Sequence, residues 1–341
     1  MSNGHHFTRP ITSESHIRSA TSLPDGLPDR LEALIERARP NQPMRTAVVH
    51  PVDGDSLGGA LSAAEHGLIA PLLVGPPHRI RDAAEAAGLD ISTLPIIATA
   101  HSHEAAERAV ALVHTGEADA LMKGALHTDE FMHPIVDRSQ GLRTARRMSH
   151  VFVVDEPSYP RLMLVTDAAL NIHPNLEEKR DIVQNAADLA RALGIRLPRI
   201  AIVCAVETVT PQMQSTLEAA ALCKMADRGQ IKGALLDGPL GFDLAVSPGA
   251  MHSKHLHSEV AGRADVVVVP DLEAGNMLAK QLEYLADARL AGVVLGARVP
   301  IILTSRSDST HTRLASCAVA LLYRQWQLEQ SALVTSAPDT T

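Results

Sequence analysis

Short apolar segments alternate with longer amphipathic segments through most of this chain, and this alternation is the strongest constraint on its fold. Strand–helix alternation predicts parallel sheets whose two faces are covered by helices. The apolar segments contain few polar residues, which is typical of strands buried on both faces. The predicted strands are 46–52, 71–74, 95–99, 120–123, 151–155, 162–166, 199–205, 233–237, 265–270, 292–295 and 300–304. The predicted helices are 56–66, 80–87, 103–114, 176–193, 212–228, 272–288 and 311–327.

One pair of predicted strands breaks the alternation. The segments 151–155 and 162–166 are separated only by Glu156-Pro157-Ser158-Tyr159-Pro160-Arg161, which is too short for a crossover helix. We therefore predict an antiparallel hairpin at this point. A chain of 341 residues is expected to form two domains at roughly 150 residues each, and the hairpin marks the passage from the first domain to the second.

Composition excludes several classes of function. The net charge is −8 and aromatic residues make up only 2%, which argues against nucleic-acid binding. No apolar run approaches the roughly 20 residues needed to span a bilayer, and the first residues lack the apolar segment of a signal peptide. Three cysteines without a CxxC spacing indicate a reducing compartment. We expect a cytoplasmic protein with no membrane partner and a flexible N-terminal segment, 1–40.

The segment 296–312 places reactive groups directly after a predicted strand. The strand ends near Thr304, and Ser305, Arg306 and Asp308 follow it before a helical pattern begins. Ligands bind at the carboxyl ends of strands in open α/β sheets, and a helix N-terminus favours an anion. Ser and Asp are also ordinary helix caps. Capping does not require the guanidinium of Arg306, whose planar fork matches a phosphate or an oxyanion.

Two further segments could bind phosphate groups. Lys123, Gly124 and Thr128 follow a predicted strand, where glycine permits close approach of a ligand and the two polar side chains can contact phosphate. Four arginines within ten residues would produce a local positive field, with a solvated basic surface as the alternative. These arginines are Arg138, Arg143, Arg146 and Arg147.

Polar residues also follow two strands of the second half. Asp167 and Asn171 follow the strand 162–166, and Asp237 ends the strand 233–237 before a Gly-Pro turn. Such residues fit the wall of a cleft, although loop aspartates commonly accept backbone N–H groups instead. The chain has no GxGxxG after an early strand, no P-loop and no HExxH, so we expect neither a nicotinamide cofactor nor a metal site.

The segment GARVPIILTSRSDS (296–309) resembles the C-terminal motif of the phosphate acetyl/butyryltransferase family. The resemblance continues in LMKGALHTDEFM (121–132), GLRTARRMSHVFVVD (141–155), LVTDAALNIHP (164–174) and LLDGPLGFDLAVS (235–247). It is greatest to the form that often occurs fused behind an enoyl-CoA hydratase domain, although no such domain precedes the matching region here.

The resemblance implies a fold and a division of the chain. It implies two α/β domains with mostly parallel sheets and a cleft between them, as in isocitrate and isopropylmalate dehydrogenases. The end of the chain would return to the first domain, which would comprise 41–155 and 297–341. The second domain would comprise 156–296. A homodimer is also a family expectation and the commonest symmetric state.

The resemblance also implies an activity. The enzyme would transfer an acyl group, acetyl before butyryl, between coenzyme A and inorganic phosphate, with acyl phosphate as the other product. Coenzyme A would be a substrate rather than a permanently bound cofactor. Ser305 and Arg306 match the family's catalytic pair, and Lys123, Thr128, Arg143, Arg146, Arg147, Asp167, Asn171 and Asp237 are the expected substrate-binding residues.

The identity of the general base is less clear from the sequence. In acetyltransferases of the family an acidic residue seven positions after the serine is proposed as the base, but Thr312 occupies that position here. Asp308 is the nearest carboxylate and is our candidate, with Asp167 and Asp237 as the next ones. Two other functions remain open, a decarboxylating dehydrogenase of the same broad fold and a non-catalytic ligand-binding protein.

Overall fold

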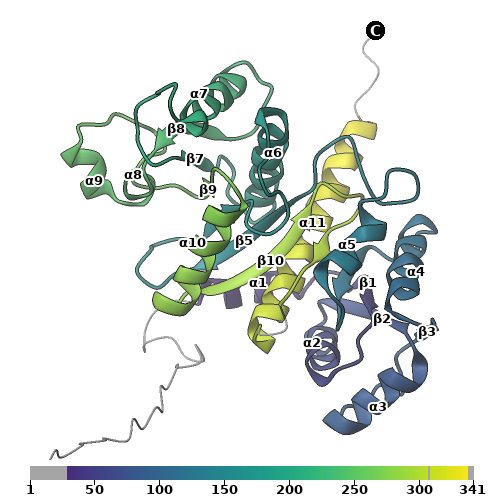
Figure 1. The fold of residues 1–341 in the computed structure, drawn as a ribbon. Helices are drawn as coiled ribbons and strands as arrows, with labels where there is room; N and C mark the ends of the chain where they lie inside the picture. Colours follow the sequence, from purple (N-terminus) through teal and green to yellow (C-terminus); the bar gives the residue numbers. More distant parts are fainter. Residues whose placement is uncertain (1–28, 306–307, 337–341) are drawn as a thin grey trace, which may run out of the picture.

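The computed structural model describes residues 29–305 and 308–336, which are built around one sheet of 11 strands (Figure 1). The strands are β1 (Met44–Val49), β2 (Ile69–Gly75), β3 (Ile96–Ala98), β4 (Ala120–Lys123), β5 (Ser149–Asp155), β6 (Met163–Thr166), β7 (Arg199–Val203), β8 (Leu235–Leu240), β9 (Val266–Val268), β10 (Arg289–Leu295) and β11 (Ile301–Ile302). The helices are α1 (Arg30–Ala38), α2 (Gly54–Glu65), α3 (Pro77–Ala87), α4 (Ser102–His114), α5 (Thr128–Ile135), α6 (Leu176–Ala192), α7 (Gln214–Asp227), α8 (Phe242–Val246), α9 (Pro248–Ser253), α10 (Leu272–Leu285) and α11 (Thr310–Ser336). None of the described helices is both long enough and apolar enough to cross a membrane.

The strands lie in the order β3-β2-β1-β4-β11-β10-β5-β6-β9-β7-β8. The five strands at one end are parallel to one another, and so are the four at the other end. The predicted α/β class, the mostly parallel pairing and the β5–β6 hairpin are confirmed. The centre differs from the prediction, because β10 is antiparallel to both β5 and β11. The link between β10 and β11 is too short for a crossover helix, so these strands form a second antiparallel pair.

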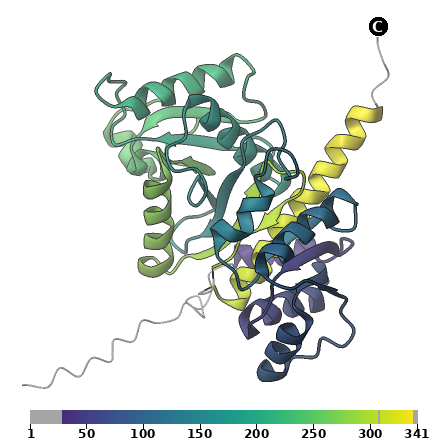
Figure 2. The same cartoon turned by 45° about the vertical axis from the view of Figure 1, so that its right-hand side comes forward.

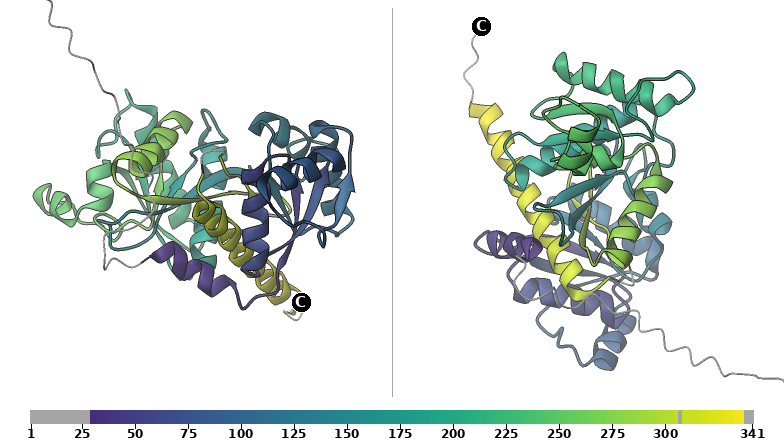
Figure 3. Two further views of the ribbon diagram at one scale, coloured as in Figure 1. Left: turned by 90° about the horizontal axis from the view of Figure 1, so that it is seen from below. Right: turned by 90° about the vertical axis from the view of Figure 1, so that its left-hand side faces the viewer.

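Apolar side chains form one continuous core on one face of the sheet, which we call the continuous face. Helices α1, α2, α6, α7 and α11 all bury residues in this core. Side chains of β1 and β9 alternate between the two faces, as expected for strands buried on both sides: Val48 faces this core, whereas Ala47 and Val49 face the other side. Helix α11 runs along this face past both halves of the sheet (Figures 2 and 3).

The opposite face carries two separate cores, and we call it the divided face. One core lies under α4 and α5, and the other lies under α8 and α10. Strand β10 passes between α5 and α10 in Figure 1. The division leaves the middle strands β5 and β10 less covered on this face than on the continuous face. A cavity between the two cores is the consequence, and it contains the candidate site.

Residues 30–38 require a correction of the predicted N-terminal segment. They form α1, which begins at the N-cap Asp29 and buries Leu31, Leu34 and Ile35 in the continuous core. The sequence between 30 and 38 has apolar positions three and four residues apart, and this spacing was overlooked. Residues 1–28 lie outside the described part of the chain.

A buried carboxylate connects α1 to the sheet. Asp155, at the end of β5, is 2% exposed and accepts from the backbone N–H of Arg30 at 2.8 Å and from its guanidinium at 2.5 Å. The guanidinium of Arg289, on the neighbouring strand β10, lies 3.2 Å from the same carboxylate. This cluster therefore links the first helix to the two central strands.

We predict that Asp155→Ala lowers the free energy of unfolding by about 3 kcal/mol, because it leaves two guanidinium groups without their buried partner. The control is Asp119→Ala, which removes a 25% exposed partner of Arg45 and should cost less than about 1 kcal/mol. Urea unfolding followed by circular dichroism measures both. Equal stability of the two variants would contradict the assignment of α1 to the folded core.

Candidate active site

A pocket of about 500 Å³ lies between the two cores of the divided face. His150 and Phe152 of β5 line its floor together with Leu290 of β10. Helix α10 contributes Leu272, Asn276 and Lys280 from the second half of the chain. The other end of the sheet contributes the segments that follow the neighbouring strands β4 and β11. Both halves of the sheet therefore supply residues to one cavity.

The turn that follows β11 is held by reciprocal hydrogen bonds. Ser305 donates its backbone N–H to the Asp308 carboxylate at 2.7 Å, and the Asp308 N–H donates to the Ser305 carbonyl at 3.2 Å. The expected alternative, that Asp308 caps the following helix, is wrong. Ser309 is the cap of α11, because its hydroxyl accepts the backbone N–H of Thr312 at 3.1 Å. Ser305, Asp308 and Thr312 all line the pocket, whereas Arg306 lies outside the described residues.

Burial raises the pKa of Asp308 above its ordinary value. The backbone N–H of Ser305 opposes this rise, and the negative charge of Glu283 adds to it. The positive charges of Lys280 and Arg313 lower the pKa of Asp308 again. A carboxyl group with a raised pKa is a stronger base than an ordinary aspartate, which suits a group that must accept a proton.

Arg313 supports this turn from beneath, and the sequence analysis did not identify it. Its side chain is 4% exposed and donates to the carbonyl oxygen of Ser305 at 3.1 Å and to the hydroxyl of Thr304 at 3.4 Å. It also donates to the carbonyl of Asp308 at 3.4 Å. A buried arginine in the first turn of an amphipathic helix is visible in the sequence only as a charge at an apolar position.

The turn after β4 provides a second group of polar residues. Lys123 is 5% exposed, and its ammonium group donates to the carbonyls of Gly124 and Leu126 at 3.3 and 3.2 Å. Lys123 and Thr128 both line the pocket, and their contact with phosphate stays a prediction. Gly124 has a different role from the expected one. A Cβ on it would lie 2.3 Å from the Val49 carbonyl oxygen, so the missing side chain permits close packing of this turn on β1 rather than on a ligand.

The cluster of arginines between 138 and 147 faces α6 more than the pocket. Arg146 contacts the Asp188 carboxylate at 2.5 Å. Arg147 donates to the side-chain oxygen of Asn171 at 2.7 Å and lies 3.2 Å from Glu178. Of the described residues that line the 500 Å³ pocket, none belongs to this cluster. Substrate binding by Arg143, Arg146 and Arg147 stays a prediction.

Asp167 is buried in a loop beside the pocket. Its carboxylate accepts the backbone N–H groups of Ala169 and Leu170, both at 3.0 Å, and the side-chain amide of Asn171 at 2.5 Å. Burial raises its pKa, and these hydrogen bonds oppose the rise. The loop lines the pocket through Ala169. Asp167 and Asn171 thus shape the wall of the cavity, which leaves their contact with substrate a prediction.

Asp237 lies on β8 at the edge of the sheet, where it accepts the N–H of Gly238 at 2.8 Å. It does not line the 500 Å³ pocket, so the structure does not bring it together with Ser305 and Asp308. Its role in binding substrate stays a prediction.

Helix α10 adds a cation that the sequence analysis missed. Leu272, Asn276 and Lys280 are spaced by four residues, which places them on one face of the helix, toward the pocket. The ammonium group of Lys280 lies 2.7 Å from Glu283. Burial lowers the pKa of Lys280, but the hydrogen bond and charge of Glu283 raise it above the ordinary value, so the group is positively charged. The spacing of four residues between Leu272, Asn276 and Lys280 is the feature of the sequence that could have identified Lys280.

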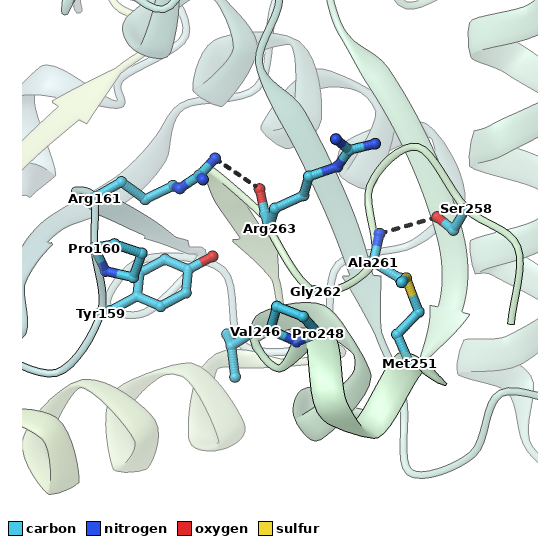
Figure 4. Close-up of a pocket in the computed structure, with 10 residues that line it drawn as sticks. All are labelled: Tyr159, Pro160, Arg161, Val246, Pro248, Met251, Ser258, Ala261, Gly262 and Arg263. Carbon is cyan, nitrogen blue, oxygen red and sulfur yellow. Dashed lines mark hydrogen bonds between the residues drawn. The ribbon is translucent and has the colours of Figure 1, made fainter. Parts of the chain in front are cut away.

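A second cavity of about 460 Å³ lies in the second half of the chain (Figure 4). It is lined mainly by apolar groups, including Tyr159, Pro248 and Met251, and the guanidinium of Arg161 bonds there to the carbonyl of Arg263 at 3.3 Å. It contains none of the residues predicted from the sequence. The 500 Å³ pocket is therefore the better candidate, because it gathers hydroxyl, carboxyl and ammonium groups.

One group of side chains has the spacing of metal ligands, Asp29, Glu32 and His311. Asp29 already accepts hydrogen bonds from Arg289 and from the backbone N–H of Glu32. The group lies beside α1, on the continuous face, and none of its members lines the 500 Å³ pocket. We therefore assign it to the packing of α1 and α11.

Comparisons with known proteins agree on one family. The model of the family described as phosphate acetyl/butaryl transferase matches residues 95–321. A phosphate acetyltransferase of Rhizobium meliloti is 57% identical over 87% of this chain and 94% of its own length. A phosphate butyryltransferase of Clostridium acetobutylicum is 41% identical over 85% of this chain and 96% of its own. A branched-chain phosphotransacylase from Enterococcus faecalis V583 has a crystal structure that superposes with a TM-score of 0.72, at 29% identity, covering 82% of this chain and 99% of that one.

Two adjacent glycines of α2 allow the support of the turn by Arg313 to be tested. A Cβ on Gly59 would lie 2.5 Å from Cδ of Arg313, whereas a Cβ on Gly58 would meet only Leu89 Cδ1, at 4.0 Å. We predict that Gly59→Ala lowers the free energy of unfolding by about 1–3 kcal/mol, because a buried arginine must move. Gly58→Ala is the matched control and should raise stability by up to about 1 kcal/mol. If urea unfolding gives the same result for both, Arg313 does not fix the turn.

Proposed function

The chain belongs to the phosphate acetyl/butyryltransferase family, and we propose on that premise that it transfers an acyl group reversibly between coenzyme A and inorganic phosphate. The observation that carries the proposal is the Ser305–Asp308 turn in a pocket that also contains two lysines. Hydroxyl, carboxyl and ammonium groups are also the groups that acyl transfer requires. Transfer to a thiol requires removal of its proton, stabilisation of charge on the carbonyl oxygen, and binding of the phosphate.

We assign the proton transfer to Asp308. In the direction of acyl-CoA synthesis, the thiol of coenzyme A loses its proton to the carboxylate and attacks the carbonyl carbon of the acyl phosphate. The bond from carbon to the phosphate oxygen breaks, and phosphate leaves. Ser305 hydrogen-bonds the reacting groups, and Arg306 stabilises the negative charge on the oxygen or the departing phosphate. Direct transfer in a ternary complex needs no acyl-enzyme, because the thiolate is itself a strong nucleophile.

The anionic substrates are attracted by local cations in an acidic protein. Lys123 and Lys280 lie on opposite sides of the pocket, and the N-terminus of α5 begins beside it at Thr128. Helix N-termini and ammonium groups both favour phosphate. We propose that these groups bind the transferred phosphate, and that Arg143, Arg146 and Arg147 attract the phosphates of coenzyme A from outside the pocket.

Several properties of the whole protein belong to the same proposal. We propose the division into two domains, 41–155 with 297–341 and 156–296, with the cleft at the gap in the divided face. The isocitrate dehydrogenase-like plan and the subgroup often fused to an enoyl-CoA hydratase domain rest on the sequence motifs. A homodimer is proposed from the family alone. The free thiols of Cys204, Cys223 and Cys317 support a reducing location such as the cytoplasm.

We predict that the purified protein releases free thiol from acetyl-CoA only when inorganic phosphate is present. A thiol-reactive dye measures this directly. A phosphate acetyltransferase at 57% identity is more similar to this chain than a phosphate butyryltransferase at 41%, so we expect kcat/KM for acetyl-CoA to exceed that for butyryl-CoA by at least about tenfold. A preference for butyryl-CoA would show that the enzyme favours the longer acyl group. No thiol release from either substrate would overturn the proposed function.

Asp308→Asn tests the base. The amide oxygen of Asn can still accept the Ser305 N–H, so the turn and the melting temperature should change little. We predict a loss of about 10²-fold or more in kcat for acyl phosphate formation and its reverse. Because a base must be ionised and burial raises the pKa of Asp308, wild-type activity should fall as the pH drops through that raised pKa, and Asn should remove this decline.

The control for this variant is Asp90→Asn, which changes a carboxylate that also accepts a backbone N–H, from Ser92 at 2.9 Å, but lies outside the pocket. It should keep the wild-type rate. If Asp308→Asn also keeps the wild-type rate and acid limb, the base lies elsewhere.

A further inference from the structure

The floor of the 500 Å³ pocket carries a histidine that the mechanism above does not use. His150 lies on β5, and its side chain is 1% exposed. Its Nδ1 is buried and has no hydrogen-bond partner among the described residues. The ring packs edge-on against Phe152, with centroids 4.4 Å apart and an angle of 74° between the planes. The ring nitrogen that is left to bond a ligand in the pocket is therefore Nε2.

His150 is uncharged at neutral pH, because burial lowers its pKa to about 3. A neutral imidazole has one N–H donor and one acceptor nitrogen. Nδ1 has no acceptor among the residues that the structure describes, so we place the proton on Nε2. A histidine with so low a pKa accepts a proton poorly, but a neutral ring in a dry site is an effective donor to an oxygen that gains negative charge. The chemistry of His150 therefore favours hydrogen-bond donation over base catalysis.

The absence of a side chain at Gly292 leaves the His150 ring uncrowded on the side of Nε2. This glycine lies on β10, where it pairs with Phe152 of β5. A Cβ on Gly292 would lie 3.0 Å from Nε2 of His150, 3.1 Å from the carbonyl oxygen of Leu303 and 3.5 Å from Cε1 of Phe152. Any side chain here would therefore crowd His150 at the floor of the pocket. Leu290 and Leu303 also line the pocket, and they make the surroundings of the His150 ring apolar.

We propose that Nε2 of His150 donates a hydrogen bond to the carbonyl oxygen of an acyl group bound in the 500 Å³ pocket. This proposal rests on the proposed acyl transfer. When phosphate attacks the carbonyl carbon of acyl-CoA, the carbon–sulfur bond breaks and the sulfur takes a proton. Negative charge rises on the carbonyl oxygen in between. His150 keeps its own proton throughout and stabilises that charge, so its contribution appears in the transition state more than in substrate binding.

His150→Phe tests the proposal, because phenylalanine keeps the ring and its contact with Phe152 but removes the donor. We expect kcat for phosphate-dependent thiol release from acetyl-CoA to fall about 10²-fold. The KM for acetyl-CoA should change by less than about threefold, since the lost interaction belongs to the transition state. His150→Gln, which restores an N–H donor, should recover part of the rate. His66→Phe, on a histidine outside the pocket, is the control and should keep the wild-type rate.

Gly292→Ala provides an independent test that leaves His150 in place. The added methyl group should displace the ring and lower kcat, and the double variant with His150→Phe should lose no more than His150→Phe alone. If His150→Phe does not fold, a wild-type rate in Gly292→Ala overturns the proposal by itself. If it folds, a wild-type kcat overturns it, as does a Gln variant no faster than the Phe variant.

The pH profile separates donation from other roles. If His150 donates a hydrogen bond, the profile of His150→Phe should have the same shape as that of the wild type at a lower rate. Loss of an acid limb in this variant would make His150 a base and contradict the proposal. If the wild-type protein itself releases no thiol from acetyl-CoA, the proposed function fails, whereas an active wild type with an equally active His150→Phe overturns only the role of His150.

Discussion

The continuous core on one face of the sheet is the constraint on which the rest of this structure depends. Helices α1, α6 and α11 pack in the same core as the strands of both halves, so the sheet stays in one piece although its two ends point in opposite directions. The other face can then divide without separating the halves. The pocket forms at that division, and its floor is made of the two central strands, which the continuous face holds in register. The difference between the continuous face and the divided face therefore produces a cleft. Its floor is rigid, and two sets of helices form its walls.

The sequence predicted the existence of every strand because each is a short apolar run bounded by polar turns. It could not predict the centre of the sheet. Strand β10 lies between β11 and β5. Its pairing with β5 joins segments that are more than 100 residues apart in the sequence, and no local sequence pattern indicates such a pairing. The short helices α5, α8 and α9 were also missed. Helix α5 is only eight residues long and contains Pro134 near its end.

Prediction of the site succeeded where residues follow adjacent strands. Strands β4 and β11 are neighbours, so the polar residues after them, Lys123, Thr128, Ser305 and Asp308, line one pocket. It failed where a site residue comes from the side of an element rather than its end. Lys280 lies in the middle of α10. His150 lies near the start of β5, and the four residues that follow it in this strand are apolar. From the sequence alone such residues are interpreted as part of the packing of a helix or strand. Only the tertiary structure shows that the face on which they lie borders a cavity.

The charges around the pocket explain why these residues work together. An acidic protein repels phosphate and coenzyme A at long range, and we propose that the exposed arginines near α6 oppose that repulsion outside the pocket. Inside, Lys280 is positive because Glu283 holds its proton, while the same Glu283 raises the pKa of Asp308. Glu283 thus keeps a cation charged and makes a nearby carboxylate more basic. When substrate excludes water from the pocket, these interactions strengthen, because the local dielectric constant falls. In the proposed mechanism, the base Asp308, the cation Lys280 and the neutral His150 act together on the acyl group.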